Sequence, residues 1–256
     1  MGIFILDHFM VKYNYNFNAK GIYNYMEQVQ KRYSKIKEKF PREFILLQGT
    51  GCFWKKCLFC DYYEDVSEKP FETNKKVIDK VTGEFGVLDV INSGSAMELD
   101  PQTLNYLIKK VKEQKIKELW FEAHWNYHGK LKEFSKKFEG CKVNYRIGVE
   151  TFNKNLRNFW NKGIPETVDI SEIIKYFKSV CLLIGTEKQT FETVVNDIYL
   201  ADKYFDHYMI NIFIPNSKNI NSNPELINRF INEIYPKIKN DPKVEISINN
   251  TDLGVG

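Results

Sequence analysis

Three of the five cysteines in this 256-residue chain, Cys52, Cys57 and Cys60, lie close enough in sequence to act on one metal centre. Their C-x4-C-x2-C spacing puts three thiolates on one loop, where each can bind a different iron of a cubane iron–sulfur cluster. The fourth iron then has no protein ligand, and an open metal position is what a catalytic site needs. An odd number of thiols with one tight cluster also favours a reducing compartment over a disulfide framework. The sequence therefore predicts a catalytic iron–sulfur site.

A structural zinc site is the alternative for the same three thiols. Zinc would need a fourth ligand, which Asp61, His124 or Cys141 could supply. None of these residues stands at a typical zinc-finger spacing, so the iron–sulfur cluster is favoured. Cys141 and Cys181 lie at or near expected strands, and we expect both to be inert core thiols.

The segments that must position the cysteine loop alternate between short apolar runs and amphipathic stretches. Strands are expected at 44–47, 85–91, 118–123, 143–149, 180–184, 208–214 and 244–248, and helices at 21–39, 73–81, 101–114, 130–138, 170–177, 190–204 and 224–238. We expect Thr73 to cap the second of these helices and Pro101 to open the third. Such alternation predicts parallel strands joined by right-handed crossovers, in either a doubly wound sheet or a βα barrel.

Residues with chemical potential collect where the expected strands end. The cysteine loop follows the first strand, and the turn 92–95 follows the second. Glu122 and His124 stand at the third strand, and Glu150 ends the fourth. In a βα barrel the active site lies at the carboxyl ends of the strands. The sequence therefore predicts one site at that end of the sheet.

The cysteine loop resembles that of the radical S-adenosylmethionine (SAM) superfamily. The usual spacing there is C-x3-C-x2-C, with an aromatic residue just before the last cysteine, and Phe59 has that position. This chain has one extra residue between Cys52 and Cys57. The resemblance covers about residues 44–215. It implies an α/β fold, a partial (β/α)6 TIM-like barrel, with SAM and a [4Fe-4S] cluster bound by Cys52, Cys57 and Cys60 as cofactors.

Further blocks are similar to the radical SAM domain of the elongator acetyltransferase group. In that group a Ser-Gly-Ser turn, here within 92–95, meets the SAM amino group, and acidic residues at the third and fourth strand ends face the cavity. The block "RIGVETF" resembles the fourth-strand block of the group, and a glycine turn after the fifth strand lets adenine approach the backbone. Phe213 would flank the adenine from the sixth strand. The resemblance thus implies cofactor-binding roles for Phe59, Asn92, Ser93, Gly94, Ser95, Glu122, Arg146, Glu150, Gly185 and Asn211.

Two histidines and two aromatic residues gather in the segment 124–128, just after the third expected strand. Aromatic rings can stack on a flat base, and histidine or tyrosine can transfer protons. We therefore expect His124, Tyr127 and His128 to contact the substrate as catalytic residues. The alternative is that these side chains cap the barrel.

The composition favours a single globular domain over residues 1–256, with 43% hydrophobic residues and a formal net charge of +4. We expect an N-terminal helical extension at 1–43, a core barrel at 44–215, and a C-terminal helix with a possible last strand at 216–256. The small excess of 37 basic over 33 acidic residues is no strong nucleic-acid footprint. No apolar run approaches the length of a membrane span, and the N-terminus lacks the features of a signal peptide, so a cytoplasmic location is expected.

The resemblance implies radical chemistry: an electron from the cluster cleaves SAM, and the resulting 5′-deoxyadenosyl radical takes a hydrogen atom from the substrate. A flavodoxin- or ferredoxin-type donor would supply the electron. Since no RNA-binding module is evident, a nucleoside or nucleotide is a better candidate substrate than intact tRNA. The chain is most similar to the queuine lyases, which release queuine from queuosine 5′-phosphate. The alternatives are a tRNA-modifying or peptide-modifying radical SAM enzyme and a non-catalytic zinc-binding interaction module.

Overall fold

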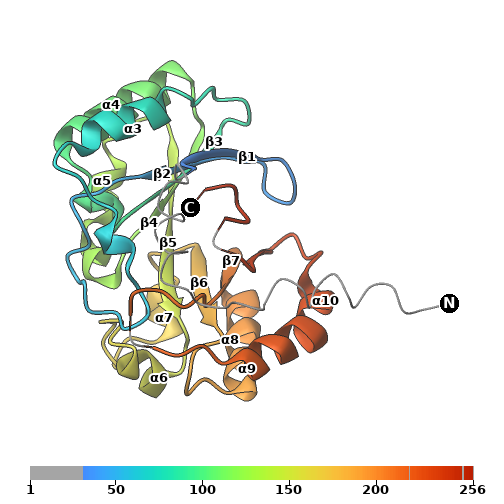
Figure 1. Ribbon diagram of the computed structural model, residues 1–256. Coiled ribbons are helices and arrows are strands. Elements are labelled where there is room, and N and C mark those ends of the chain that lie inside the picture. Colours follow the sequence, from blue (N-terminus) through green and yellow to red (C-terminus); the bar gives the residue numbers. More distant parts are fainter. Residues whose placement is uncertain (1–30, 219, 250, 256) are drawn as a thin grey trace, which may run out of the picture. The chain divides into compact units, whose positions relative to one another are not determined.

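An eight-stranded sheet, with its strands in chain order, frames the protein (Figure 1). The computed structural model describes residues 31–256 except 219, 250 and 256, and the sheet belongs to the unit formed by residues 32–256. The strands are β1 (Tyr33–Ile36), β2 (Arg42–Leu47), β3 (Val87–Asn92), β4 (Glu118–Glu122), β5 (Lys142–Glu150), β6 (Ser179–Ile184), β7 (His207–Ile212) and β8 (Val244–Ser247). β1 pairs antiparallel with β2, and β2 to β8 are parallel.

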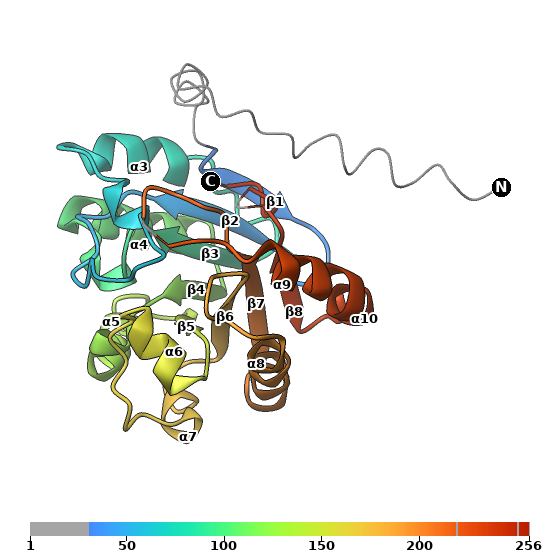
Figure 2. The same ribbon diagram turned by 60° about the horizontal axis from the view of Figure 1, so that its bottom comes forward.

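Helices connect the parallel strands and cover the outer face of the curved sheet (Figure 2). They are η1 (Tyr62–Glu64), α3 (Pro70–Ile78), η2 (Ala96–Glu98), α4 (Pro101–Glu113), η3 (Trp125–Lys130), α5 (Leu131–Ser135), α6 (Lys154–Phe159), α7 (Ile170–Ile173), α8 (Phe191–Tyr204), α9 (Pro224–Arg229), the π-helical turn η4 (Phe230–Ile234) and α10 (Tyr235–Ile238). None of the helices in the described part of the chain is long and apolar enough to cross a membrane.

Alternation along each strand divides the side chains between an apolar outer layer and a polar inner face. On β4, Leu119 and Phe121 are fully buried in the core between sheet and helices, whereas Trp120 and Glu122 point the other way. The same period places apolar side chains of every parallel strand under the helices. The inner face is therefore free to carry polar and reactive groups.

A buried ion network closes the bottom of the inner face. Arg42 of β2 donates two hydrogen bonds of 2.7 Å to Glu245 of β8, which links the first and last parallel strands. Arg42 also donates a 2.9 Å hydrogen bond to Asp89 of β3, which accepts a 2.8 Å hydrogen bond from Arg146 of β5. Each buried charge in this network therefore meets an opposite charge.

The expected fold class is confirmed. All seven expected strands exist, as β2 to β8, and they form a curled, partly closed barrel of the TIM type. The barrel has seven parallel strands instead of six, since the possible last strand pairs with β7 as β8. Asp100 caps α4, as its side chain accepts a 2.9 Å hydrogen bond from the Thr103 N–H, and Pro101 is the first residue of that helix.

The helix expected at 21–39 is wrong where the structure describes it, since Tyr33–Ile36 is strand β1. Its pairing with β2 and a 2.8 Å hydrogen bond from the Tyr33 hydroxyl to Glu43 outweigh local helix propensity. The remainder of that helix, and most of the expected 1–43 extension, lies outside the described residues.

Other helix boundaries also differ from expectation. The helix expected at 73–81 begins at Pro70, so Thr73 is not its cap. The helices expected at 130–138 and 170–177 end at Ser135 and Ile173. The helix expected at 224–238 is interrupted by the π-helical turn before Pro236, which has no N–H for a regular helical hydrogen bond.

Candidate active site

The loop that carries the three cysteines leaves the end of β2 and turns sharply twice. Gly51 has a φ of +95°, which glycine adopts without strain. Lys55 has a φ of +51°, which is uncommon for a residue with a Cβ. Lys55 lies between Cys52 and Cys57, where the chain has one residue more than the usual radical SAM spacing. The left-handed turn at Lys55 therefore accommodates the extra residue.

Trp54 anchors the first half of this loop. Its indole Nε1 donates a 2.6 Å hydrogen bond to the carbonyl of Asn161, and its ring stacks on His124 with centroids 5.7 Å apart. Gly163 lies under the indole with a φ of +75°, and a Cβ there would stand 2.5 Å from ring carbons. Only glycine fits so close to the ring, so Trp54 and Gly163 together fix the loop.

The second half of the loop packs on the end of α6. The Phe59 ring meets the Trp160 ring edge-on, with centroids 5.7 Å apart, and Cys57 and Cys60 contact the same apolar cluster. Asn216, which follows β7, donates a 2.8 Å hydrogen bond to the carbonyl of Phe59. Phe59, expected to bind a cofactor, is thus a buried packing residue between the two cysteines.

The three thiols suit an iron–sulfur cluster. Cys52, Cys57 and Cys60 are free and half-buried. Burial raises the pKa of the Cys57 thiol and raises that of Cys60 to about 12, while the positive charge of Lys162 opposes both shifts. Metal binding would have to displace these protons, as it does at thiolate sites in general. Three thiolate donors on one loop fit three irons of a cubane.

The residues considered as a fourth zinc ligand do not join these thiols. Both ring nitrogens of His124 lie within hydrogen-bond distance of backbone groups. Asp61 accepts hydrogen bonds from Ser217, and Cys141 precedes β5, at the opposite end of that strand from Glu150. Among the residues that the structure describes, no three His, Cys, Asp or Glu side chains converge as the ligands of a single ion would. Ligands of different irons in a cubane do not have to converge in this way.

Glu98 in η2 joins the cysteine loop to the turn after β3. Its Oε1 accepts hydrogen bonds from the Phe53 N–H at 2.6 Å and the Tyr127 hydroxyl at 3.0 Å, and Oε2 accepts one from the Ser95 N–H at 2.5 Å. Its carbonyl accepts hydrogen bonds from the N–H and hydroxyl of Thr50 at 3.0 and 2.9 Å. Glu98 is buried, and it therefore holds the loop on both sides of the first cysteine.

The turn 92–95 lies directly against the cysteine loop. A Cβ on Gly94 would stand 3.2 Å from the Cα of Cys52 and 2.3 Å from Glu98 Oε2, so glycine permits this close approach. Asn92 stabilises the turn by a 3.1 Å hydrogen bond from Nδ2 to the carbonyl of Ser95. The structure thus brings the expected SAM turn next to the first cysteine.

The two serines of the turn tie neighbouring loops together. Ser93 Oγ accepts a 2.7 Å hydrogen bond from the Gly49 N–H, and Ser95 Oγ accepts a 3.0 Å hydrogen bond from the His124 N–H. Both serines are buried. Each hydroxyl keeps its own O–H donor, so a ligand contact from this turn would come from those donors or from the backbone.

Glu150 ends β5 in a strained conformation beside the cysteine loop. Its φ is +68°, and the β5–β6 register shifts between Gly148 and Glu150. Lys162 Nζ lies 2.8 Å from Glu150 Oε1, and both side chains are largely buried. Burial acts to lower the pKa of Lys162, but the charge of Glu150, followed by those of Cys57 and Cys60, raises it. The result is a charged pair held next to two of the three thiols.

Glu122 and Arg146 lie on the inner face but differ in access. Arg146 is fully buried, and its Nη1 and Nη2 donate to Asp89 at 3.3 and 2.8 Å. Nη1 also lies 3.4 Å from Glu122 Oε1, which Cys181 Sγ approaches at 3.8 Å. Burial raises the pKa of Glu122, against the charge of Arg146. Arg146 therefore positions Glu122 from below and does not reach a ligand itself.

His124 and His128 are each held by contacts with neighbouring backbone groups or rings. His124 Nε2 lies 2.7 Å from the Lys162 carbonyl, and Nδ1 accepts a 3.2 Å hydrogen bond from the Asn126 N–H. Burial, with the charge of Lys162, lowers the pKa of His124 to about 4. His128 stacks on Trp125, with centroids 4.3 Å apart, so its contacts lie in the helical layer. These contacts are of the kind expected if the two histidines cap the barrel, and their catalytic role stays a prediction.

Tyr127 reaches the cysteine loop indirectly, through its hydrogen bond to Glu98, whereas the His124 ring stacks directly on Trp54 of the loop. Burial and the charge of Glu98 raise the pKa of the Tyr127 phenol. It therefore remains protonated and donates to the carboxylate.

Gly185 and Asn211 have different surroundings. Gly185 has a φ of +99°, and a Cβ there would stand 2.3 Å from Ile227 of α9, so this close packing requires glycine, and its expected role towards adenine stays a prediction. Asn211 is half-buried on β7, on the same face as His207 and Met209, and Phe213 beyond it joins the apolar cluster around Phe59. Asn211 therefore lies on the inner face, where a ligand could meet it.

Tyr62 was missed from the sequence. It is 63% exposed, yet burial and the negative charges of Cys60, Glu122, Asp61 and Glu150 raise the pKa of its phenol. Tyr62 lies in η1, two residues after Cys60, so it places an exposed aromatic ring beside the cysteine loop.

Trp54, Glu98 and Lys162 were also missed. Glu98 lies three residues after its partner Ser95, and Lys162 lies twelve residues after its partner Glu150, in segments where charged residues are common. Lys162 stands directly before Gly163, and this position by itself does not indicate a role at the site. Their roles depend on contacts between different loops, which spacing does not reveal.

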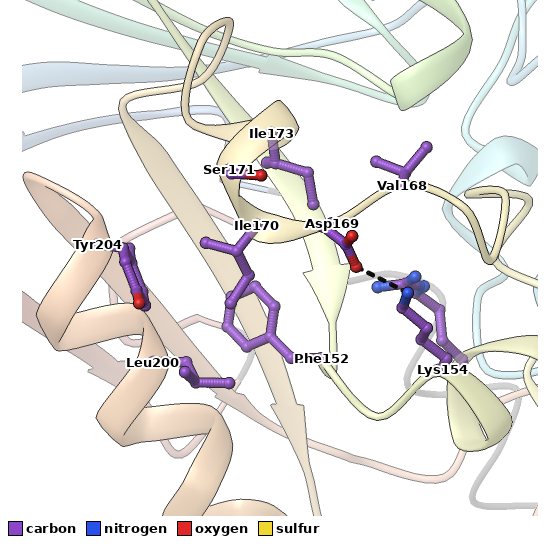
Figure 3. A pocket seen from close by; sticks show the side chains of 10 residues that line it. Phe152, Lys154, Val168, Asp169, Ile170, Ser171, Ile173, Leu200 and Tyr204 are labelled. Carbon is purple, nitrogen blue, oxygen red and sulfur yellow. Dashed lines mark hydrogen bonds and ion pairs between the residues drawn. The ribbon is translucent and has the colours of Figure 1, made fainter.

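A separate pocket of about 320 Å³ lies between α6, α7 and α8 (Figure 3). Phe152, Ile170 and Leu200 provide apolar walls, and Lys154 and Asp169 form a 2.7 Å ion pair at its edge. None of the cysteine-loop residues lines it. This pocket is therefore distinct from the candidate active site.

No family model and no curated protein sequence matches the chain. A solved structure does: the queuine lyase from Clostridium spiroforme bound to SAM and queuine, with 43% sequence identity and a TM-score of 0.85. The alignment covers 89% of this chain and 99% of that chain. Identity at this level over nearly the whole length is more than a shared fold, and the chain belongs to the queuine lyase family of radical SAM enzymes.

Proposed function

We propose that this enzyme cleaves SAM reductively at a [4Fe-4S] cluster and releases queuine from queuosine 5′-phosphate. The observation that carries the proposal is the likeness to a queuine lyase bound to SAM and queuine, together with three free thiols on one ordered loop. When bound, the cluster and SAM supply a 5′-deoxyadenosyl radical that removes a hydrogen atom from the substrate. The protein supplies position and exclusion of water.

In this proposal Cys52, Cys57 and Cys60 would hold the cluster through their three thiolates, which leaves one iron without a protein ligand. Glu98 and Trp54 keep the loop in one conformation through their hydrogen bonds. A loop fixed on both sides holds its ligands in a productive geometry before the cofactor arrives.

The SAM contacts are proposed to come from two edges of the loop. The 92–95 turn offers the remaining donors of Ser93 and Ser95, and Glu150 with Lys162 offers opposite charges to the ammonium and carboxylate of a methionine group. Asn211 lies on the inner face across the sheet. Gly185 is left out of this set because Ile227 occupies its open side.

We also propose the electron donor, the cellular location and the substrate class of this enzyme. A flavodoxin- or ferredoxin-type protein would deliver the electron, and the reduced thiols suit the cytoplasm. A nucleotide that carries the queuine base is consistent with the queuine bound in the relative.

The test is anaerobic reconstitution with iron and sulfide, followed by reduction and addition of SAM and queuosine 5′-phosphate. We expect close to four irons per chain and release of both 5′-deoxyadenosine and queuine. Cys57→Ala should lose both products, whereas Cys141→Ala, which changes a thiol outside the loop, should retain them. Stoichiometric zinc without iron, or SAM cleavage that never releases queuine, would reject the proposal.

A further inference from the structure

On the inner face of the sheet, solvent exposure begins at Glu122. Below it, Asp89 and Arg146 are completely buried. The Glu122 side chain itself is 34% exposed, and Ile91 and Asn211 on other strands of the same face are also half-buried. Glu122 therefore marks the floor of the part of the barrel that solvent can reach.

Glu122 is held from one side only. Its Oε1 has two weak contacts, with Arg146 at 3.4 Å and Cys181 at 3.8 Å. No hydrogen bond reaches Oε2 from the residues that the structure describes. The carboxylate thus has unused acceptor capacity on its open side, since an ionised carboxylate has about four acceptor positions.

The support beneath Glu122 is rigid. Arg146 is fixed by two hydrogen bonds to Asp89, Asp89 accepts another from Arg42, and Arg42 is bound twice by Glu245. Several charge-assisted hydrogen bonds in one buried network leave its members little freedom, although Arg146 Nε has no hydrogen-bond partner among the described residues. Arg146 is therefore a fixed support beneath Glu122 Oε1, and the other carboxylate oxygen is left for a ligand.

We propose that Glu122 reads the base of the substrate by accepting hydrogen bonds from the two adjacent N–H donors of a guanine-type edge. This inference rests on the proposed function. Queuine is a 7-deazaguanine, so its ring N1–H and 2-amino group point the same way and match the acceptors of one carboxylate. The adenine of SAM presents one amino donor beside a ring-nitrogen acceptor, which a carboxylate repels. Enzymes that act on an extruded base commonly read it by this edge and stack it on an aromatic ring.

An aromatic residue beside the cysteine loop could assist. Tyr62 lies in η1, two residues after Cys60, and is 63% exposed. An exposed aromatic face can stack on a flat base, while Glu122 fixes the base in its plane.

The test compares binding of queuine, of its 2-deamino analogue and of SAM to the cluster-loaded protein by calorimetry. Wild-type protein should bind queuine about 10- to 100-fold more tightly than the analogue. Glu122→Gln should weaken queuine binding by about the same factor and abolish that preference, because its amide nitrogen would face an N–H donor. Its affinity for SAM should be unchanged.

The matched control is Glu118→Gln, on the same face of β4, whose carboxylate instead accepts hydrogen bonds from Trp120 and Asn144. It should keep wild-type affinity for queuine. Iron content and thermal unfolding of each variant establish that it is folded. If Glu122→Gln binds queuine normally, or loses SAM instead, the inference is overturned while the proposed function stands. If wild-type protein binds no queuine, the proposed function itself fails.

Discussion

Lys162 Nζ lies 2.8 Å from Glu150 Oε1, in a pair whose side chains are only 13% and 10% exposed. Glu150 keeps this position with a left-handed backbone, which costs a residue with a Cβ about 1 kcal/mol or more. A strained backbone conformation persists only where the surrounding residues stabilise it. The surroundings of Glu150 include the cysteine loop. The pair is therefore part of the architecture of the site and not a chance surface contact.

Removing one member of this pair should cost more than removing both. Lys162→Met leaves the Glu150 carboxylate largely buried without its partner, and we expect it to lower the free energy of unfolding by about 3 kcal/mol. The double variant Lys162→Met/Glu150→Gln should recover at least half of that loss. Urea unfolding of the metal-free proteins measures both. Strict additivity of the two single changes would show that the pair is not coupled.

The glycine beneath Trp54 offers a second prediction with an internal control. Gly163 and Gly140 both have positive φ, +75° and +78°, but only Gly163 faces a side chain at 2.5 Å, whereas nothing lies within 4 Å of a Cβ on Gly140. Gly140→Ala should cost about 1 kcal/mol of backbone strain. Gly163→Ala should cost a further 1 to 3 kcal/mol, since the indole must move.

The same pair of variants separates strain from cluster assembly. Displacement of Trp54 should reduce the iron that Gly163→Ala retains after reconstitution, while Gly140→Ala should match the wild type. Iron analysis and visible absorbance report this directly. Equal iron content and equal stability in the two variants would mean that Trp54 does not fix the loop.

The strands were predictable because their apolar runs record burial against the helices. The apolar run from Val180 to Ile184, for example, is typical of a buried strand, and it lies in β6. β1 was not predictable, because Tyr33 and its neighbours gain their strand conformation from pairing with β2. The interruption of the C-terminal helix before Pro236 was not predictable either. A proline inside a helix can either kink it or end it, and the packing around the helix determines which occurs.

The site was predictable where chemistry is local in sequence. The three cysteines, the 92–95 turn and Glu150 meet at one end of the sheet, as strand ends in a parallel sheet must. The contacts of His124 were only partly predictable, since Asn126 is local but Lys162 is 38 residues away. Of the three side-chain hydrogen bonds of Glu98, the one from Ser95 is local, and those from Phe53 and Tyr127 come from other segments of the chain.

Glu98 should prove essential to the loop, and Tyr127 should not. Every side-chain partner of Glu98 is a donor, so Glu98→Gln must direct its amide nitrogen at an N–H or O–H group and leave a buried donor unpaired. We expect a loss of about 1 to 3 kcal/mol in stability and lower cluster retention. Thermal unfolding and iron analysis provide the measurements.

Tyr127→Phe tests the expected catalytic role of this phenol against a purely structural one. It removes one donor and leaves Glu98 bound to the Phe53 and Ser95 N–H groups, so stability should fall by only about 1 kcal/mol, with normal iron content. If Tyr127 transfers a proton, release of queuine should fall by at least about 100-fold while SAM binding is kept. A change of less than about threefold would assign it to the scaffold.

We expect the buried carboxyl group of Asp197 to make the free energy of unfolding depend on pH in an unusual direction. Its Oδ1 accepts a 2.8 Å hydrogen bond from the Phe152 N–H, but Oδ2 is buried and has no partner among the described residues. Burial raises the pKa of this carboxyl from 3.8 to about 6. Between these two values the folded protein binds more protons than the unfolded chain, so the free energy of unfolding falls as the pH rises through this window, by about 3 kcal/mol in total.

Asp197→Asn isolates this effect because it keeps the Oδ1 acceptor for Phe152 and cannot ionise. We expect the variant to be more stable than the wild type by about 2 kcal/mol at pH 7.5, and the difference to vanish towards pH 4. Urea unfolding of both proteins at several pH values gives the difference, in which all other titrating groups cancel. A difference that stays constant across this range would mean that Asp197 has an ordinary pKa, and that its carboxylate is compensated in the folded protein.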